Sequence, residues 1–400
     1  KVGPFGSQLS GTDFLKEESD FWVYNQRIVL DENYEAGDAY ISSEKYETMI
    51  GFHVYEDDIL ITTRGTIGKI SRIPHIHKPG ILHPCIIRFR IDDSLYDYRL
   101  LKLIFNQSDF VTEQILYKSN ATTIEVIYSD TLKNVILPVW DMQTQRKIAD
   151  FLDTKCSEID ALTADIQTQI DTLEQYKRSV ITATVTKGLN PDVEMKDSGI
   201  EWIGEIPVTW DIIRGKYLLK YLQKPVKEDD GVITCFRDGE VTLRSNRRED
   251  GFTMSDKEIG YQGIDAGDLV VHGMDGFAGA IGISDSRGKA SPVLNVMDTK
   301  QNKRYIMYYL RSMAYSDVFV ALATGIRVRS CDLRWNKLAD LSYPVPSIEE
   351  QTAIVEYIDT TLEKTDVVIS KKKAQLETLD EYKKSLIYEY VTGKKEVPSI

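Results

Sequence analysis

The chain has 400 residues, of which 42% are hydrophobic and 28% charged, so it carries enough apolar material for more than one buried core. It has no long apolar run and its four cysteines lack paired spacing, which predicts no membrane span, no disulfide framework and no thiolate metal site, and fits a reducing cytoplasm. The formal net charge of −13 lacks the basic excess of typical DNA-binding domains, so any DNA contact has to come from local clusters.

The first block of the chain ends near residue 136 and is predicted to be rich in strands. Short stretches of Ile, Val, Tyr and Phe alternate with turns of Gly, Asp and Asn. From Asp58 to Ile70 the pattern is an apolar strand, a glycine-rich turn and a second strand. A helical stretch from Asp97 to Tyr117 precedes the last strand. We therefore expect a compact α+β block.

Three histidines and a cysteine lie close together in this block, at His75, His77, His83 and Cys85. Two histidines at alternate positions of one strand point to the same side, as a zinc site needs. Three prolines and a glycine interrupt the segment, however, and favour an irregular exposed loop with solvated histidines. We therefore predict no metal site.

A long helix is predicted for residues 142–189. Pro138 cannot lie inside it, and Gly188 suits its C-terminus. Apolar residues recur at alternating three- and four-residue steps, which is the period of a coiled-coil seam. The expected seam consists of Leu152, Ile159, Leu162, Ile166, Leu173, Tyr176, Val180 and Ala183, with Lys155 and Gln169 in its two polar positions.

The second block is a distant copy of the first. The stretch from Asp268 to Ile283 again reads as strand, glycine-rich turn and strand, and a helical stretch from Lys303 to Leu322 follows. The residues that lead up to Pro344 also match those that lead up to Pro138. Two diverged copies of one frame suggest that two different targets are recognised by the same method.

The second long helix, predicted for residues 347–393, repeats the first without a gap. The matched pairs are all 206 residues apart: Pro138 and Pro344, Gln145 and Gln351, Asp160 and Asp366, Tyr176 and Tyr382, Lys177 and Lys383. A constant offset over about fifty positions indicates a duplication. Because a folded block has to connect the two helices, antiparallel pairing is the simplest way to bury both seams.

Two different blocks that alternate with two copies of one helix resemble the specificity subunit of type I restriction–modification enzymes. The run from Glu349 to Gln351 is similar to the proline–glutamate–glutamine motif that opens the helices of this family, from which the run Gln143 to Gln145 departs slightly. The stretch from Lys196 to Trp210 is similar to the one that opens its target-recognition domains. Nothing ahead of Gly3 corresponds to that stretch, so we expect the chain to lack its first few tens of residues.

The resemblance implies an α+β protein with two α/β target-recognition domains and two long helices that pair as an antiparallel coiled coil with pseudo-twofold symmetry. The expected division is a first recognition domain at 1–141, a first helix at 142–189, a second recognition domain at 190–346, a second helix at 347–393 and a tail at 394–400.

The sequence lacks the motifs of a self-sufficient enzyme. It contains no GxxxxGK[ST] phosphate loop, and no glycine-rich cofactor turn with the Asn/Asp-Pro-Pro-aromatic loop that methyl transfer to a base amino group needs. A nuclease site among Asp192, Glu194 and Lys196 is not favoured, because a flexible linker would not fix a metal. We therefore expect a non-catalytic chain that binds no cofactor.

Basic and polar residues cluster in the loops of both blocks, although the first block has 14 basic against 20 acidic residues and the second has 21 against 23. Arginine suits bidentate contact with guanine or phosphate. The residues predicted to contact DNA are Arg64, Thr66, Lys69, Arg72, Lys118, Thr122 and Thr123 in the first block, and Arg237, Arg244, Asn246, Arg247, Arg248, Arg327, Arg329 and Arg334 in the second.

The family resemblance also implies partners. Double-stranded DNA would be read as a bipartite, asymmetric site, two methylation subunits would modify adenine with S-adenosylmethionine, and restriction subunits would use ATP and Mg in defence against phage. The alternative from the residues alone is a coiled-coil scaffold that presents two protein-binding modules. The acidic balance favours the scaffold, and the clustered arginines favour DNA.

Overall fold

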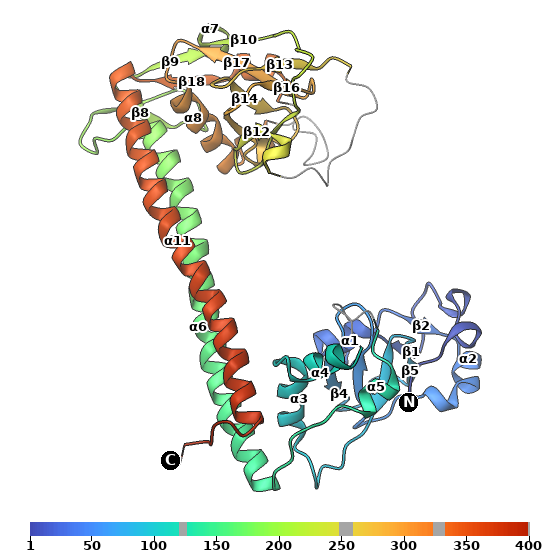
Figure 1. The fold of residues 1–400 in the computed structure, drawn as a ribbon. Helices are drawn as coiled ribbons and strands as arrows, with labels where there is room; N and C mark the ends of the chain where they lie inside the picture. Colours follow the sequence, from blue (N-terminus) through green and yellow to red (C-terminus); the bar gives the residue numbers. More distant parts are fainter. Residues whose placement is uncertain (120–125, 248–258, 323–332, 399–400) are drawn as a thin grey trace. The chain divides into compact units, whose positions relative to one another are not determined.

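The computed structural model describes residues 1–119, 126–247, 259–322 and 333–398 (Figure 1). Contacts divide the chain into two compact units. One comprises Lys1–Ile166 with Lys373–Ile400, and the other comprises Gln167–Lys372. Each long helix therefore contributes one part to each unit.

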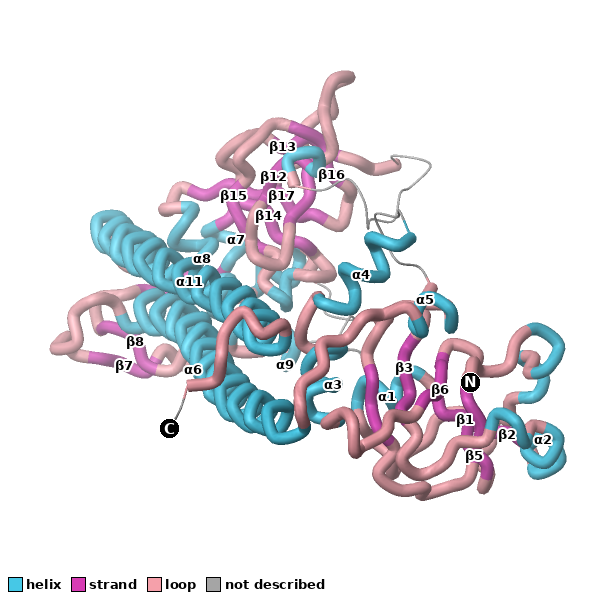
Figure 2. Tube along the Cα trace, turned by 60° about the horizontal axis from the view of Figure 1, so that its bottom comes forward, coloured by secondary structure: helices cyan, strands magenta, loops and turns pink. Residues whose placement is uncertain are grey.

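Within the described residues, the first unit contains two three-stranded sheets (Figure 2). In one, β1 pairs antiparallel with β2 and parallel with β5; in the other, β3 pairs antiparallel with β4 and β6. The strands are β1 (Phe21–Tyr24), β2 (Tyr40–Ile41), β3 (Ile59–Thr62), β4 (Ile70–Arg72), β5 (Gly80–Leu82) and β6 (Ile86–Phe89). The helices are α1 (Gln26–Asp31), α2 (Ser43–Thr48), α3 (Tyr98–Asn106), α4 (Phe110–Ser119) and α5 (Ser129–Lys133), with 3-10 turns η1 (Gly6–Gln8), η2 (Gly11–Asp13) and η3 (Ile50–Phe52).

Strand β3 lies at the centre of the first unit. Its Ile59, Leu60 and Ile61 are fully buried, so both faces of the strand are covered, which explains why its apolar run is continuous rather than alternating. On one side it shares a core with the apolar face of α3. That face consists of Leu100, Leu101, Leu103, Ile104 and Phe105.

The second unit is built around a four-stranded antiparallel sheet in the order β10–β17–β14–β15, accompanied in its described part by the pairs β11–β12, β13–β16, β18–β9 and β7–β8. The strands are β7 (Met195–Asp197), β8 (Glu205–Pro207), β9 (Asp211–Arg214), β10 (Leu219–Tyr221), β11 (Ile233–Cys235), β12 (Val241–Leu243), β13 (Gln262–Ile264), β14 (Leu269–His272), β15 (Ile281–Ile283), β16 (Gly288–Ala290), β17 (Leu294–Thr299) and β18 (Ser342–Val345). The helices are α7 (Gly215–Leu218), α8 (Lys303–Tyr315), α9 (Val318–Ala321) and α10 (Trp335–Asp340), with 3-10 turns η4 (Arg244–Asn246) and η5 (Gly276–Ala278).

Three fully buried tyrosines hold the core of the second unit together. The hydroxyl of Tyr305 shares its one hydrogen between the carbonyls of Val185 and Pro344, at 3.1 and 3.0 Å. The hydroxyl of Tyr309 donates to the Ser342 carbonyl at 2.7 Å, and that of Tyr343 donates to a carbonyl of α10. Because a buried hydroxyl without a partner costs free energy, these bonds fix where α8 and β18 meet the end of the first long helix.

The two units differ at the strand before each long helix. In the second unit β18 pairs with β9 in antiparallel register, with Tyr343 opposite Ile213. The equivalent residues of the first unit, 136–139, form no strand with any described residue, and the side chains of Ile136 and Val139 are each 71% exposed.

The long helices α6 (Met142–Lys187) and α11 (Ile348–Val391) run antiparallel in each unit. In the first unit the Lys383 ammonium contacts the Asp160 carboxylate at 2.7 Å. In the second unit Lys177 contacts Asp366 at 2.6 Å. These two ion pairs are copies of each other under the 206-residue offset, so the predicted antiparallel pairing is confirmed.

The predicted seam is only half right. Leu152, Ile159, Ile166 and Val180 are buried as expected. At the alternate positions the more deeply buried residues lie one place further on, at Cys156, Thr163, Ile170, Lys177 and Thr184, whereas Leu162, Tyr176 and Ala183 are exposed. The predicted polar positions Lys155 and Gln169 are half-buried, and Gln169 accepts a hydrogen bond from Lys372 of the other helix. The same shift occurs in α11, where Ile369 is buried while Val368 and Tyr382 are exposed. Counted from Leu152, the buried positions of α6 are spaced four and then three residues apart, not three and then four as predicted. Leu162 and Tyr176 therefore lie at the side of the helix pair.

No helix in the described part of the chain is both long enough and apolar enough to cross a membrane.

Candidate nucleic-acid interface

Each block presents a glycine-rich turn at one end of its central sheet, between β3 and β4 in the first and between β14 and β15 in the second. The same backbone bond holds both turns. The amide of Ile127 donates to the carbonyl of Thr63 at 3.0 Å, and that of Leu333 donates to Gly273 at 2.9 Å. Ile127 and Leu333 are again 206 residues apart. The two turns are therefore equivalent places in the two copies, and their side chains differ.

In the first unit this turn exposes Arg64 and Thr66. The side-chain amide of Gln26 hydrogen-bonds the backbone of the turn at Thr66, which holds the turn against α1. Gly65 and Gly68 have φ angles of +68° and +77°, a region that favours glycine, so the turn needs both of them. Arg64 makes no ion pair with any described residue.

Two other predicted residues of the first block have structural partners. The Lys69 ammonium donates to the Asn106 carbonyl at 2.5 Å, and burial lowers the pKa of Lys69. The Arg72 guanidinium contacts the Asp93 carboxylate at 2.6 Å and lies over the ring of Tyr98. Both basic groups hold the first unit together.

The remaining predictions for this block lie at or beyond the end of α4. Lys118 belongs to that helix, and nothing is described of its side chain. Thr122 and Thr123 lie outside the described residues.

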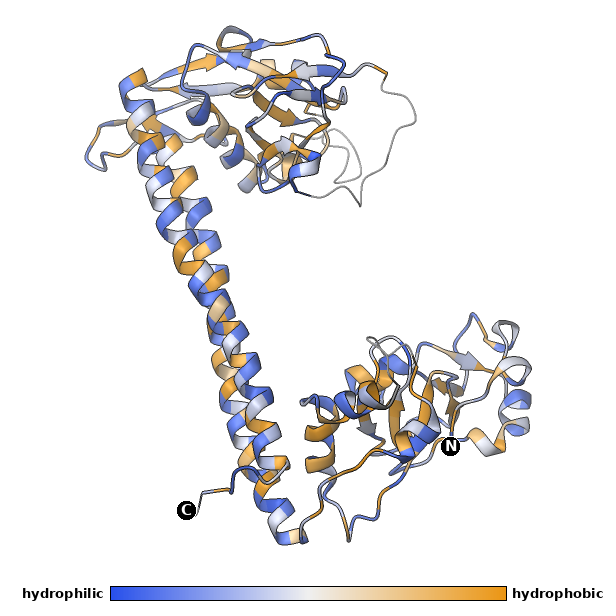
Figure 3. Cartoon of the chain, viewed as in Figure 1, coloured by the Kyte–Doolittle hydropathy of each residue, from blue (hydrophilic) through white to orange (hydrophobic). Residues whose placement is uncertain are grey.

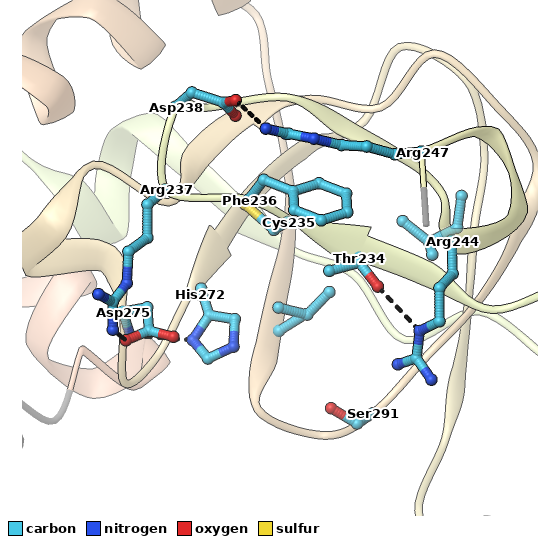
Figure 4. A pocket seen from close by; sticks show the side chains of 12 residues that line it. Thr234, Cys235, Phe236, Arg237, Asp238, Arg244, Arg247, His272, Asp275 and Ser291 are labelled. Atoms are coloured by element: carbon cyan, nitrogen blue, oxygen red, sulfur yellow. Dashed lines mark hydrogen bonds and ion pairs between the residues drawn. The ribbon is translucent and has the colours of Figure 1, made fainter. Parts of the chain in front are cut away.

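In the second unit three predicted arginines, Arg237, Arg244 and Arg247, surround a cavity of about 620 Å³ at the His272 end of β14 (Figure 4). The β11–β12 hairpin supplies one wall, and the turn after β14 supplies another. Arg237 contacts the carboxylate of Asp275, which belongs to this turn, at 2.9 Å. The cavity thus brings together residues from three separate stretches of sequence.

Arg247 is held by both of its terminal nitrogens. One contacts Asp238 at 2.6 Å and the other contacts Glu240 at 3.0 Å, while the guanidinium lies over the Phe236 ring at 4.2 Å (Figure 4). The orientation of the Arg247 guanidinium is therefore fixed, and the group is paired with two carboxylates. A guanine or phosphate contact has to compete with Asp238 and Glu240.

Arg244 and Asn246 lie on the 3-10 turn η4 and are tied to the same hairpin. Arg244 donates from Nε to the Thr234 hydroxyl at 3.3 Å, and Asn246 donates to the Thr242 hydroxyl at 2.9 Å. Because Arg244 uses Nε for this bond, its two terminal nitrogens extend beyond the hairpin into the cavity (Figure 4).

Of the other arginines predicted for this block, Arg334 is exposed at the N-cap of α10. It directly follows Leu333, whose amide bonds the turn after β14. Arg248, Arg327 and Arg329 lie outside the described residues.

His272 is a residue of this cavity that the sequence did not single out. Its Nδ1 accepts hydrogen bonds from the amides of Met274 and Asp275 at 3.2 and 2.9 Å. Burial lowers the pKa of His272, so the ring is neutral near pH 7 and its proton is assigned to Nε2. Cys235 beside it stays a thiol, because burial raises its pKa to about 12. The cavity therefore offers one neutral imidazole donor among charged groups.

The cavity is not strongly basic, because carboxylates pair with two of its three guanidinium groups. Arg237 pairs with Asp275, and Arg247 pairs with Asp238 and with Glu240, which is not part of the cavity lining. Such a surface gains little from simple attraction to phosphate. It provides hydrogen-bond donors and acceptors in fixed directions, which suits the reading of base edges.

The histidine cluster of the first unit has a different arrangement. His75 and His77 both contact the carboxylate of Glu35, at 2.6 and 3.0 Å, while His83 accepts from the Cys85 amide. Among the residues that the structure describes, no group of three or more His, Cys, Asp or Glu side chains is arranged to hold a metal ion.

Residues 9–172 match a family described as the type I restriction modification DNA specificity domain. The specificity subunit of the type I restriction enzyme MjaVIII from Methanocaldococcus jannaschii is 25% identical over 405 residues, which cover 93% of this chain and 89% of that protein. The specificity subunit of the type I restriction enzyme EcoBI from Escherichia coli is 22% identical over 377 residues, which cover 86% of this chain and 75% of that protein. These matches confirm the resemblance to type I specificity subunits.

Among solved structures, a chain from work on complex assembly and conformational transition of the type I R-M system superimposes with a TM-score of 0.62 at 13% identity. The match covers 85% of this chain and 82% of that one. It confirms the fold class predicted from the sequence.

Proposed function

We propose that this chain is the DNA sequence-specificity subunit of a type I restriction–modification complex and is itself non-catalytic. The observation that carries the proposal is the duplicated frame with different side chains at equivalent turns. The ion pairs between the helices and the backbone bonds of the turns occur twice, whereas Arg64 and Thr66 have no counterpart in the arginine cavity of the second unit. Two different readers on one frame imply a bipartite, asymmetric DNA site.

Within each block, we assign DNA reading to exposed basic and polar residues at the glycine-rich turn or the cavity next to it, and to the predicted residues whose side chains lie outside the described part of the chain. In the first block these are Arg64, Thr66, Lys118, Thr122 and Thr123, and in the second they are Arg237, Arg244, Arg247, Arg248, Arg327, Arg329 and Arg334. Lys69, Arg72 and Asn246 act by holding these segments in place, because their polar groups are bound within their own unit.

The chain acts through partner subunits in this proposal. Two methylation subunits use S-adenosylmethionine to methylate adenine, and restriction subunits use ATP and Mg, in the cytoplasm. The carboxylates paired with Arg247 in the arginine cavity and the net charge of −13 both mean that this chain alone binds DNA weakly. Strong binding then needs basic surfaces on the partners.

Single substitutions in the two turns test the assignment of half-sites. In the assembled complex, Arg64→Ala should alter the bases accepted in one half of the methylated site, and Arg244→Ala should alter those in the other half. A lost base contact costs about 1–3 kcal/mol of discrimination. Genome-wide mapping of methylated adenines gives the recognised sequence for each variant directly.

Two exposed basic residues away from the turns serve as matched controls. Lys16 lies in the first block, and Lys216 lies on α7, at the end of the sheet opposite to the cavity. Lys16→Ala and Lys216→Ala should leave both halves of the site unchanged. If the unaltered complex methylates no bipartite site, the chain is a protein-binding scaffold instead, and if each arginine variant alters both halves, the blocks do not read DNA independently.

A further inference from the structure

Both long helices begin at a fully buried glutamine. Gln145 and Gln351 occupy equivalent positions of the repeat, and each is 0% exposed. A side-chain amide has two donor hydrogens and one acceptor oxygen, and burying it is costly unless these are bonded. Both glutamines satisfy all three, and they do so with equivalent partners.

In the first unit Gln145 binds the start of α3. Its oxygen accepts from the amide of Asp97 at 2.9 Å, and its nitrogen donates to the carbonyls of Leu95 and Trp140, both at 2.8 Å. Asp97 is the N-cap of α3, and its carboxylate accepts from the amide of Arg99. One side chain of the long helix therefore fixes the first residue of a helix that belongs to the recognition block.

In the second unit Gln351 makes the same contact with α8. Its oxygen accepts from the amide of Asn302 at 3.0 Å, and its nitrogen donates to the Gln301 side chain at 2.7 Å and to the Pro346 carbonyl at 2.9 Å. Asn302 is the N-cap of α8. The clamp therefore survives although the blocks have diverged.

Each clamped helix leads to the reading turn of its own block. At the far end of α3, the Asn106 side chain bonds both the amide and the carbonyl of Ile70 at 2.8 Å, directly after the turn that carries Arg64. In the second unit, α8 packs against η5, which forms part of the turn after β14, and against β15, which follows that turn. A rigid path thus runs from each glutamine, through one helix, to the residues proposed to read DNA.

A second contact lies further along each long helix, five residues after Gln145 and eight residues after Gln351, but it is exposed. Arg99 contacts Asp150 at 2.7 Å in the first unit, and Arg304 contacts Asp359 at 2.5 Å in the second. Ion pairs of this kind contribute little on their own because water competes for both partners. Of these two polar contacts, the buried amide is therefore the one that can fix the angle, and it acts together with the apolar packing around Ile148 and Ile354.

We propose that Gln145 and Gln351 are positioning residues that set the angle between each recognition block and its long helix, and thereby restrict the complex to one spacer length between the half-sites. The inference rests on the proposed function. Without the amide, the N-cap of α3 or α8 loses its fixed partner, and the block pivots about the short connection to the helix. Neighbouring spacer lengths then become acceptable, while the bases read by each turn stay the same.

The test uses the assembled complex with Gln351→Met or Gln145→Met, since methionine has a similar length and no amide. The substrates are duplexes with the two parental half-sites and spacers that vary by one base pair. We expect methylation at the parental spacer plus or minus one base pair, relative to the parental spacer, to rise about tenfold. Gln301→Ala removes only one of the three partners of Gln351, so it should fold readily and broaden the spacer range less.

A matched control separates positioning from simple destabilisation. Ile354→Val removes one methylene from a fully buried side chain on the same helical turn as Gln351 and leaves the clamp intact. It should lower the unfolding temperature without broadening the spacer range. A Gln351→Met complex that keeps a single spacer, or that changes the half-site sequences, would overturn the inference. A parental complex that methylates no bipartite site would instead overturn the proposed function.

Discussion

Shortening both long helices by one heptad tests whether their length sets the distance between the half-sites. The change deletes residues 162–168 from α6 and the equivalent residues 368–374 from α11. Seven residues are two helical turns to within about 20°, so the seam positions that follow keep their phase. The Asp160–Lys383 and Lys177–Asp366 ion pairs lie outside the deleted segments. We therefore expect the doubly shortened chain to fold and to assemble.

The size of the effect follows from the geometry of the two polymers. Seven residues shorten each helix by about 10 Å, at ~1.5 Å per residue. That length corresponds to about three base pairs at ~3.4 Å each. Three base pairs also turn B-DNA by roughly 100°, at about 10–10.5 base pairs per turn, whereas the heptad turns the helix by only about 20°. The shortened helices can follow the change in DNA length but not the change in DNA rotation. We therefore expect a preferred spacer shorter by roughly one to three base pairs and weaker methylation.

The assay is adenine methylation by the assembled complex on duplexes whose spacer varies one base pair at a time. Deleting residues 162–168 alone is the control, because it leaves the two helices unequal in length and should impair assembly. An assembled, doubly shortened complex that still prefers the parental spacer would refute the idea that the helices act as a ruler.

Ile387 is fully buried, whereas Asp160 is 61% exposed. In urea unfolding, Ile387→Ala should therefore lower the free energy of unfolding by about 2–5 kcal/mol, and Asp160→Ala by at most about 1 kcal/mol. Equal losses would mean that the pair of helices is held by charge. Burial lowers the pKa of His83 and of His272 below the ordinary value of 6.5. On acidification, these two histidines therefore bind protons at a higher pH in the unfolded chain than in the folded chain, which favours unfolding. The unfolding temperature should therefore fall as the pH drops below 6.5, and a rise would contradict the burial of these rings. Replacing Asp238 by Asn and Glu240 by Gln removes the two carboxylates that pair with the Arg247 guanidinium. The complex should then bind any duplex more tightly, with a salt dependence steeper by roughly one to two phosphate contacts. Unchanged binding in a salt titration would place Arg247 away from DNA.

The repeat made the architecture predictable, but periodicity alone did not locate the seam. Steps of three then four and of four then three share every second position, so Leu152 and Ile159 belong to both patterns. The sequence did contain a signal that separates them. Cys156 and Ile170 are apolar where the first pattern places Lys155 and Gln169, and the structure buries the apolar pair. The partner helix decides between the patterns, because it can cover only one of them.

The candidate site was predictable as a cluster of charge but not as a geometry. The pairing of Arg237 with Asp275 joins residues 38 positions apart, and it depends on where β14 ends relative to the β11–β12 hairpin. His272 carries no signal in the sequence, because its role comes from two backbone amides in the turn that follows it. Local patterns specify elements, whereas the partners of each side chain follow from the tertiary fold.

The two copies within one chain allow assembly contacts to be separated from reading contacts. Contacts that occur in both copies join parts of the frame: the buried glutamines on the N-caps, the ion pairs between the helices and the backbone bonds of the turns. Contacts that occur in one copy lie at the turns, such as Gln26 against Thr66 or Arg247 between two carboxylates. A frame that repeats while its turns differ can exchange the sequence it reads without rebuilding how the blocks are held. We therefore expect specificity in such a chain to change through the turns, and spacing to change through the helices and their glutamine clamps.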